Sequence, residues 1–330
     1  MAKTSCRLRA MIILFIKLGA LGDVINTLPL ATTLHEQMDA RIHWLVEPLS
    51  YPIVSGHPSV EKAVLFDKSN WTSELPGVLR ELRSVKYDMA LDLQRLVKSG
   101  LFCLASKSSR RIGFDRERCK EFTWLFPFER IPASDPCAHM AHQYMEFARH
   151  LGLKAAGIRW DIPVTGDLPA GLPDRYVVLN IGATKAANRW HPRGFASLAA
   201  ALEEHCSVAS VLTGGHEDRD MANEIASMGQ RSIINLVGRT SIMDLKEVIA
   251  GSRAVVSCDT GPMHLAVALG KEVVALMGPS DPGRTGPLRG RVVRLDLDCM
   301  PCNKRHCEDP RCMTGITAEM VLRELKDILR

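Results

Sequence analysis

The chain has 330 residues, of which 46% are hydrophobic and 24% are charged. This balance excludes a disordered or fibrous protein, and the length is that of about two globular domains. The formal net charge of +5 permits an anionic substrate or a membrane surface as a partner without requiring a nucleic acid. Ten cysteines are too few for a secreted disulfide scaffold of this length, so we expect a reducing compartment.

The first apolar run, from Ala10 to Ile16, follows three cations between residues 3 and 9 and therefore resembles the start of a signal peptide. The run is short for that purpose, and Lys17 interrupts it. We predict instead a strand that starts at Met11 and is covered on both faces. No later apolar run is long enough to span a bilayer.

A glycine-containing turn follows this strand. Gly19 and Gly22 allow a tight turn and close approach of a ligand, and Val24–Met38 is predicted to be a helix. The turn lacks the third glycine of a dinucleotide fingerprint, so it is weak evidence for NAD. Asp23 is either a partner of the helix dipole or a carboxylate that can take a proton from a hydroxyl.

The rest of the first half alternates strands and helices. We predict strands at 41–46, 60–66 and 87–93, and helices at 71–85 and 142–152. The strand at 87–93 ends in a polar turn, Gln94–Ser99. The basic stretch 107–116 is either a solvated loop or an anion-binding site.

A stretch rich in proline and glycine, Pro163–Pro173, is the predicted linker, so we divide the chain into domains 1–165 and 166–330. A second α/β series follows. We predict its strands at 176–181, 207–212, 233–236 and 272–277. We predict helices at 195–205 and 241–250, and a third helix that follows the turn at 213–218 and runs through 228. Each strand ends in glycine and polar residues, and several such turns at one sheet edge predict a ligand site.

The clearest motif of this half spans Val255–Gly270. A buried strand ends in a polar turn, and a helix opens at Pro262. Because a helix N-terminus carries unpaired N–H groups and partial positive charge, the turn at Thr260 can hold a phosphate. Asp259 ends the strand, where open α/β sheets bind ligands. The alternative is that Asp259 and Thr260 only cap the helix.

Together, these motifs resemble glycosyltransferase family 9, the ADP-heptose:lipopolysaccharide heptosyltransferases. The resemblance spans nearly the whole chain in order. It is carried by Leu18–Val24 with Leu28-Pro29; Tyr87-Asp88, Asp92–Gln94 and Lys98-Ser99; Arg111–Phe114; Gly182-Ala183 and Arg189-Trp190; Gly214-Gly215 and Glu217; and Asp259–Pro262 with His264. The segment Cys299–Cys302 and the pair Cys312-Met313 are also similar to the family.

The resemblance implies an α/β fold of GT-B type, with two facing Rossmann-like domains and a central cleft. It implies an inverting heptosyltransferase at the cytoplasmic face of the inner membrane, in peripheral contact with it, without a cofactor, a catalytic metal or a nucleic-acid partner. The first domain would bind an anionic lipid A–inner core acceptor, with Asp23 as catalytic base. The second would bind a nucleotide-sugar donor, ADP-heptose.

The site residues implied for the donor include Thr184 as a phosphate contact and Glu217 as a ribose contact. The full donor set is Thr184, Lys185, Asn188, Arg189, Glu217, Asp259, Thr260, Gly261, Pro262 and His264. An anionic acceptor calls for cations in turns that face the cleft. The predicted acceptor set is Gly19, Gly22, Arg95, Lys98, Arg111 and Arg116.

Two positions depart from the family pattern. Many relatives have lysine where this chain has Asn188, so Lys185 or Arg189 must supply the positive charge to the leaving diphosphate, or the chain is a divergent member with reduced or altered activity. His191 precedes Pro192, whereas relatives often place proline directly after tryptophan.

Four cysteines, Cys299, Cys302, Cys307 and Cys312, follow the spacing C-x2-C-x4-C-x4-C. This spacing can wrap one Zn²⁺ tetrahedrally, and it is similar to a zinc knuckle with cysteine in place of histidine. No aromatic residue in the segment could stack on a base. The alternative is a loop of free or paired thiols, without a catalytic role.

Two other functions remain open. A sugar-nucleotide epimerase can share the two-domain fold, and a non-catalytic binder of sugar nucleotides or nucleic acid is compatible with Asn188 and the cysteines. Asp23 argues against the binder, because binding alone does not require a base.

Overall fold

The structure is a computed structural model that describes residues 10–154, 157–228 and 233–329. The chain forms two compact units. The first contains the chain up to Asp161, except for Leu21–Ile25 and Cys137–Met140, which belong to the second unit with the chain from Ile162 onward. The cations that suggested a signal peptide lie outside the described residues.

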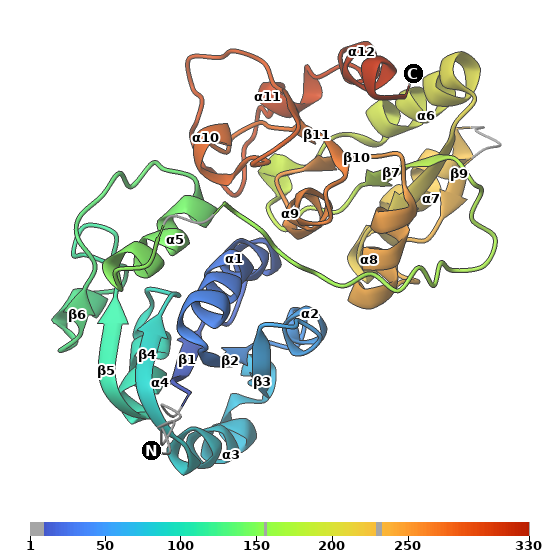
Figure 1. Cartoon of the computed structure of the whole chain (residues 1–330). Coiled ribbons are helices and arrows are strands. Elements are labelled where there is room, and N and C mark those ends of the chain that lie inside the picture. The colour runs from blue at the N-terminus through green and yellow to red at the C-terminus, as the bar shows by residue number, and fades with distance from the viewer. Residues whose placement is uncertain (1–9, 155–156, 229–232, 330) are drawn as a thin grey trace. The chain divides into compact units, whose positions relative to one another are not determined.

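The first unit is built on a parallel six-stranded sheet in the order β3-β2-β1-β4-β5-β6 (Figure 1). Its strands are β1 (Ile12–Ile16), β2 (Arg41–Val46), β3 (Val60–Leu65), β4 (Lys86–Asp92), β5 (Lys107–Gly113) and β6 (Glu129–Arg130). Every residue of β1 is buried, which is why its sequence is continuously apolar. The strand order reverses between β1 and β4, where open sheets of this kind bind ligands.

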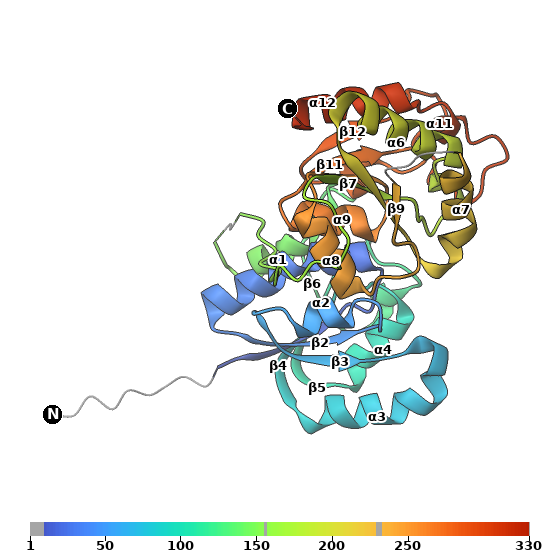
Figure 2. The same cartoon turned by 90° about the vertical axis from the view of Figure 1, so that its right-hand side faces the viewer.

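The helices of the first half are α1 (Leu21–Met38), α2 (Tyr51–Ser55), α3 (Trp71–Ser84), α4 (Val97–Ala105) and α5 (Met140–His150), with 3₁₀ turns η1 (Lys68–Asn70) and η2 (Thr123–Leu125). Helices α3 and α4 lie side by side and cover the same face of the sheet (Figures 1 and 2). Val78 and Leu82 of α3 and Phe102 of α4 share a buried cluster with Leu14 and Ile16 of β1.

The second unit repeats this plan with the order β12-β11-β10-β7-β8-β9, again all parallel. The strands are β7 (Tyr176–Asn180), β8 (Ala209–Thr213), β9 (Ile233–Asn235), β10 (Ala254–Cys258), β11 (Glu272–Leu276) and β12 (Arg291–Val293). The helical segments are η3 (Ala186–Asn188), α6 (Pro192–Cys206), η4 (His216–Asp218), α7 (Arg219–Ser227), α8 (Ile242–Gly251), α9 (Gly261–Ala268), α10 (Pro282–Thr285), α11 (Arg311–Thr314) and α12 (Ala318–Leu329). The order reverses here between β7 and β10.

Local sequence explains where the helices of this unit begin. Helix α8 starts with a capping box, in which Ser241 Oγ accepts from the Asp244 amide at 3.1 Å and Asp244 accepts from the Ser241 amide at 2.8 Å. Helix α6 starts with His191, whose Nδ1 accepts from the Gly194 amide at 2.9 Å. His191, a departure from the family pattern, therefore acts as a helix cap.

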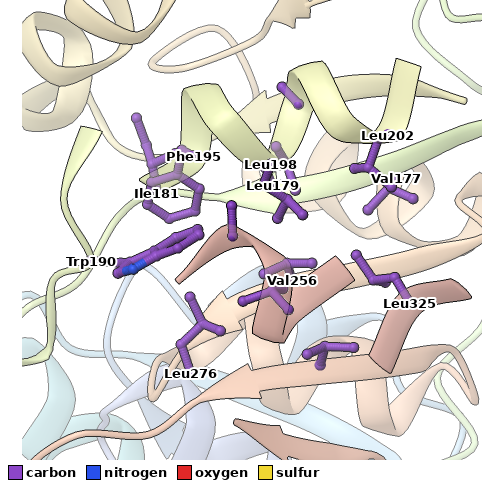
Figure 3. Close-up of a cluster of buried hydrophobic side chains, with 14 of the residues drawn as sticks. Val177, Leu179, Ile181, Trp190, Phe195, Leu198, Leu202, Val256, Leu276 and Leu325 are labelled. Carbon is purple, nitrogen blue, oxygen red and sulfur yellow. The ribbon is translucent and has the colours of Figure 1, made fainter. Parts of the chain in front are cut away.

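Helices α6 and α12 pack side by side on one face of the second sheet (Figure 3). Leu198 and Leu202 of α6 and Leu325 of α12 meet the sheet residues Leu179 and Val256 in one buried cluster. At the end of this cluster Trp190 is buried against Phe195, and its Nε1 donates to the carbonyl of Ile316 at 3.0 Å. This tryptophan fixes the turn after β7 to the core.

Most predicted strands and helices are confirmed within a few residues, but two predictions for the first half are wrong. The predicted turn Gln94–Ser99 runs into α4, and most of the basic stretch 107–116 is strand β5 and not a loop. Its charge concealed the strand, since Arg110 pairs with Glu129 of the neighbouring β6 at 2.8 Å. None of the helices in the described ranges has both the length and the hydropathy to cross a bilayer.

Candidate functional site

The most structured site lies at the strand-order reversal of the second unit, where the turns after β7 and β10 meet. Asn180 ends β7 and is buried, and its Nδ2 lies 3.1 Å from Ser257 Oγ and 3.3 Å from Thr260 Oγ1. The same amide reaches the Gly182 carbonyl at 3.2 Å. One side chain thus connects the ends of both central strands, so the two turns are held in register.

Helix α9 begins at this point, and no side chain caps its N-terminus. The hydroxyl of Thr260 donates instead to the Cys258 carbonyl at 3.3 Å, and Asp259 accepts from Thr285 Oγ1 at 3.2 Å. The alternative that Asp259 and Thr260 only cap the helix is therefore wrong. Gly261 and Pro262 form the first turn, which presents its amides and the positive end of the helix dipole to an anion.

Asn188 is buried beside this turn. Its Nδ2 lies 3.4 Å from the Asp259 carbonyl and 3.4 Å from Ser280 Oγ, whereas its Oδ1 is buried and has no hydrogen-bond partner among the residues that the structure describes. Buried polar atoms normally have a partner, so an open acceptor at this position is a candidate ligand contact.

Arg189 and Lys185 differ in what surrounds their charges. Arg189 donates to the Ala183 carbonyl at 3.1 Å and pairs with the buried carboxylate of Asp218 at 2.8 Å. Lys185 is half-buried, and among the described residues it forms no ion pair. The charge of Arg189 is thus compensated within the protein, and that of Lys185 is available to a ligand.

Asp218 is a residue that the sequence reasoning missed. It accepts from the Gly215 amide at 2.8 Å and pairs with Arg189, so it ties the turn after β8 to the turn after β7. A Cβ at Gly182 would lie 2.5 Å from Asp218 Oδ2, which explains glycine there. The sequence signal for Asp218 is the glutamate-aspartate pair after β8, in which Glu217 is exposed and Asp218 is buried.

His264, in the second turn of α9, is buried. Burial lowers the pKa of its imidazole, while the charge of Asp259 acts in the opposite direction. The neutral ring is therefore favoured near pH 7. Thr184 is exposed in the turn after β7.

The segment that carries the four cysteines crosses this site. The Ala187 amide donates to the Arg305 carbonyl at 3.1 Å, and the Asn303 amide donates to the Pro279 carbonyl at 2.8 Å. Cys299 and Cys307 are exposed, Cys302 is half-buried and Cys312 is buried, and all four are free thiols. Across the described parts of the chain, no three histidine, cysteine or acidic side chains lie close enough together to form a metal site in this geometry.

In the first unit, the turns after β1 and β4 are also linked. The Leu18 amide donates to Gln94 Oε1 at 3.2 Å, and buried Asp92 accepts from the Gln94 and Arg95 amides at 3.2 Å each. Arg95 is buried over the Phe114 ring, with a φ of 68°. Lys98 pairs with Glu47 at 3.4 Å, and Gly19 lies close to the same carboxylate.

One predicted acceptor residue, Arg111, lies differently from expectation, whereas Arg116 lies in a turn as predicted. Arg111 is in β5 and not in a turn, and its guanidinium donates to the Cys103 and Ser106 carbonyls at 3.1 and 3.2 Å. These bonds fasten Arg111 to the end of α4, so its guanidinium is already engaged within the first unit. Arg116 is exposed, with its guanidinium 4.3 Å from the Trp124 ring centre.

Asp23 and Gly22 lie in the first turn of α1, because this helix begins at Leu21, three residues before the predicted start. The N-cap position, Ala20, has no side-chain cap, and Asp23 is half-buried. The carboxylate therefore lies just beyond the carboxyl end of β1, at the positive end of a helix.

Two parallel sheets with the same strand order, each followed by anion-compatible turns at its reversal point, define an α/β protein of two Rossmann-like domains. The model of glycosyltransferase family 9 (heptosyltransferase) matches residues 77–312 of the chain. The chain therefore belongs to glycosyltransferase family 9 and is a glycosyltransferase. This membership decides against the epimerase and the non-catalytic binder.

Relatives and solved structures agree with this assignment. The chain is 27% identical to lipopolysaccharide heptosyltransferase 1 of Pseudomonas aeruginosa over 96% of this chain and 98% of that protein. It resembles the structure of E. coli ADP-heptose lps heptosyltransferase II with a TM-score of 0.80 and 26% identity, over 97% and 98% of the chains. It also resembles the structure of E. coli heptosyltransferase WaaC with ADP, with a TM-score of 0.81 and 23% identity, over 96% of this chain and 100% of that chain. The predicted GT-B class is confirmed by these likenesses.

Proposed function

We propose that this glycosyltransferase moves a heptose from ADP-heptose to the inner core of lipopolysaccharide, with inversion at the anomeric carbon. The observation that carries the proposal is the uncapped N-terminus of α9 at the reversal between β7 and β10. A diphosphate is the part of the donor that such a site suits. The same donor and acceptor are supported by the relatives, which are lipopolysaccharide heptosyltransferases, and by the similar WaaC structure, which is a structure with ADP.

On the donor side, the amides of the first turn of α9 and the hydroxyl of Thr184 would hold the diphosphate. Lys185 would neutralise the charge that develops as ADP leaves, because Arg189 already pairs with Asp218. The open Oδ1 of Asn188 would accept from a hydroxyl of the donor. The exposed carboxylate of Glu217 would accept from the ribose.

On the acceptor side, Asp23 would be the base. The acceptor hydroxyl would give its proton to the Asp23 carboxylate as its oxygen bonds to the anomeric carbon. The bond between that carbon and the diphosphate oxygen would break, and its electron pair would leave with ADP. A base positioned in this way typically contributes about 10²–10⁴-fold to the rate.

The acceptor would be an anionic, lipid-anchored sugar at the cytoplasmic face of the inner membrane. Arg95, Lys98 and Arg116 would attract its acidic groups, and the missing side chain of Gly19 would leave room for the acceptor sugar to approach. Of these cations, Arg95 is buried, Arg116 is exposed and Lys98 pairs with one carboxylate, and their attraction would weaken as salt is added.

The test is a donor screen with purified inner-core acceptors. We expect a mass increase of one heptose with ADP-heptose, and little or no transfer from uridine or guanosine sugars. Nuclear magnetic resonance of the product should show the anomeric configuration opposite to that of the donor. Transfer of another sugar, or retention of configuration, would contradict the proposal.

A further inference from the structure

Two adjoining surface grooves run along α3, with volumes of about 640 and 650 Å³. They share Leu75 and Leu79, and the second is also lined by α4. Both helices belong to the first unit and lie side by side in both views (Figures 1 and 2). We call the residues lining the two grooves the α3–α4 surface.

Large apolar side chains on this surface face solvent. Trp71, at the start of α3, is 56% exposed, and Leu101 and Val97 of α4 are 54% and 38% exposed. All three line the same groove. Single exposed apolar residues are ordinary, but several around one groove mark a binding surface.

The charges that line the grooves are all of one sign. The four ionisable lining residues are Lys68, Arg80, Arg83 and Lys98. Glu47, which is not among the lining residues, pairs with Lys68 at 2.8 Å and with Lys98 at 3.4 Å. Arg80 and Arg83 form no ion pair with any other residue that the structure describes, and both are exposed.

This combination fits the interface of an anionic bilayer. An exposed tryptophan and leucine can enter the boundary between headgroups and acyl chains, and long cationic side chains can reach the phosphates beside them. A protein-binding surface, by contrast, is typically depleted in lysine. Each lysine or arginine near an anionic leaflet adds to the attraction.

We propose that the α3–α4 surface docks the enzyme on anionic phospholipid, with Trp71 and Leu101 inserted and Arg80 and Arg83 on the headgroups. The proposal rests on the proposed function in one respect, because a lipid-anchored acceptor requires the enzyme to work at a membrane. It adds to that function the surface and the class of lipid.

The experiment is vesicle flotation of the full chain with phosphatidylethanolamine and phosphatidylglycerol at a ratio of about three to one. We expect the wild type to bind, and to bind pure phosphatidylcholine at least about tenfold more weakly. Trp71→Ser with Leu101→Ser, and separately Arg80→Glu with Arg83→Glu, should each lower binding at least about tenfold. The matched controls are Val292→Ser, at a residue 37% exposed on β12, and Arg323→Glu with Lys326→Glu on exposed positions of α12.

Thermal unfolding of each variant establishes that it folds, and turnover on a delipidated acceptor should stay within about twofold of wild type. Equal binding of wild type and α3–α4 variants, or equal loss in the controls, would overturn the proposal. So would a wild-type dimer that the Trp71 and Leu101 changes convert to a monomer, since the surface would then be an interface between copies. Lost flotation in the variants together with no heptose transfer by the wild type would contradict the proposed function alone.

Discussion

At the scale of single residues, the environment of each charged group decides what it can do. Arg189 and Lys185 are only four positions apart, yet Arg189 is compensated by Asp218, and the described structure gives Lys185 no ion-pair partner. Asp23 is held in the first turn of a helix, where its negative charge is favoured. Sequence alone identified all three candidates but could not rank the two cations.

Asp23→Asn should cut turnover by about 10²-fold or more while donor affinity survives, because the amide cannot accept a proton from the acceptor hydroxyl. The measurement is kcat together with ADP-heptose affinity by calorimetry. Activity within a few-fold of wild type would remove Asp23 from the mechanism and leave it as a dipole partner of α1.

Lys185→Ala should weaken ADP-heptose binding and lower kcat, each by about tenfold or more, because it removes the available charge near the leaving diphosphate. Lys185→Arg is the matched control and should retain most of both. If Lys185→Ala leaves binding and kcat unchanged, and Arg189→Ala lowers them without changing the stability of the protein, Arg189 supplies the charge instead.

At the scale of elements, the donor site is made by turns that neighbouring strands place together. Asn180 joins the ends of β7 and β10, and the Arg189–Asp218 pair joins the turns after β7 and β8. The positions of these turns depend on the close contact between Gly182 and Asp218 and on the packing of Trp190 against Phe195.

Gly182→Ala should destabilise the protein by about 1–3 kcal/mol, because its Cβ would meet Asp218 Oδ2 at 2.5 Å and force the carboxylate away from Arg189. Urea unfolding measures the loss, and donor affinity should fall with it. Gly77→Ala on α3 is the control, since nothing lies within 4 Å and alanine favours a helix. Equal stability of the two variants would mean that the turn after β7 yields easily.

Trp190→Ala should cost about 3–5 kcal/mol, because it empties the end of the core beneath α6 and breaks the bond to the Ile316 carbonyl. Trp190→Phe should lose less, since most of the volume remains. Denaturant unfolding of both variants separates packing from hydrogen bonding, and a loss under about 1 kcal/mol for alanine would contradict this view of the core.

At the scale of the whole molecule, cysteines are distributed between the core and the surface, which predicts their reactivity. Burial raises the pKa of Cys258 to about 12, and burial followed by the nearby Cys302, Cys299 and Cys307 raises the pKa of Cys312. Since the thiolate is the nucleophile, both should react slowly near pH 8.

Exposed Cys299 and Cys307 should therefore be alkylated by iodoacetamide at least about tenfold faster than Cys258 and Cys312. Mass spectrometry of timed digests measures the order, and full labelling of the slow pair should need unfolding. If Cys299 and Cys307 are protected and a chelator removes the protection, the four cysteines bind zinc.

The alternation of strands and helices, the motif Val255–Gly270 and the family can all be predicted from the amino-acid sequence. Local patterns suffice there, because buried parallel strands are continuous apolar runs and a proline after a polar turn marks a helix start. The charged sequence of β5 gave a wrong prediction of a loop. Its Arg110 is balanced by Glu129 of β6, and the sequence does not show that these two strands are neighbours.

Which side chains contact each other is visible only in the folded structure. It joined Asn180 to Thr260 across 80 positions and paired Arg189 with Asp218 across the turns after β7 and β8. It also placed α3 beside α4, so that Trp71 and Leu101 border one cationic groove. These contacts follow from the strand order and helix packing within each unit. Both arise when distant parts of the chain bury a shared core, which no local pattern encodes.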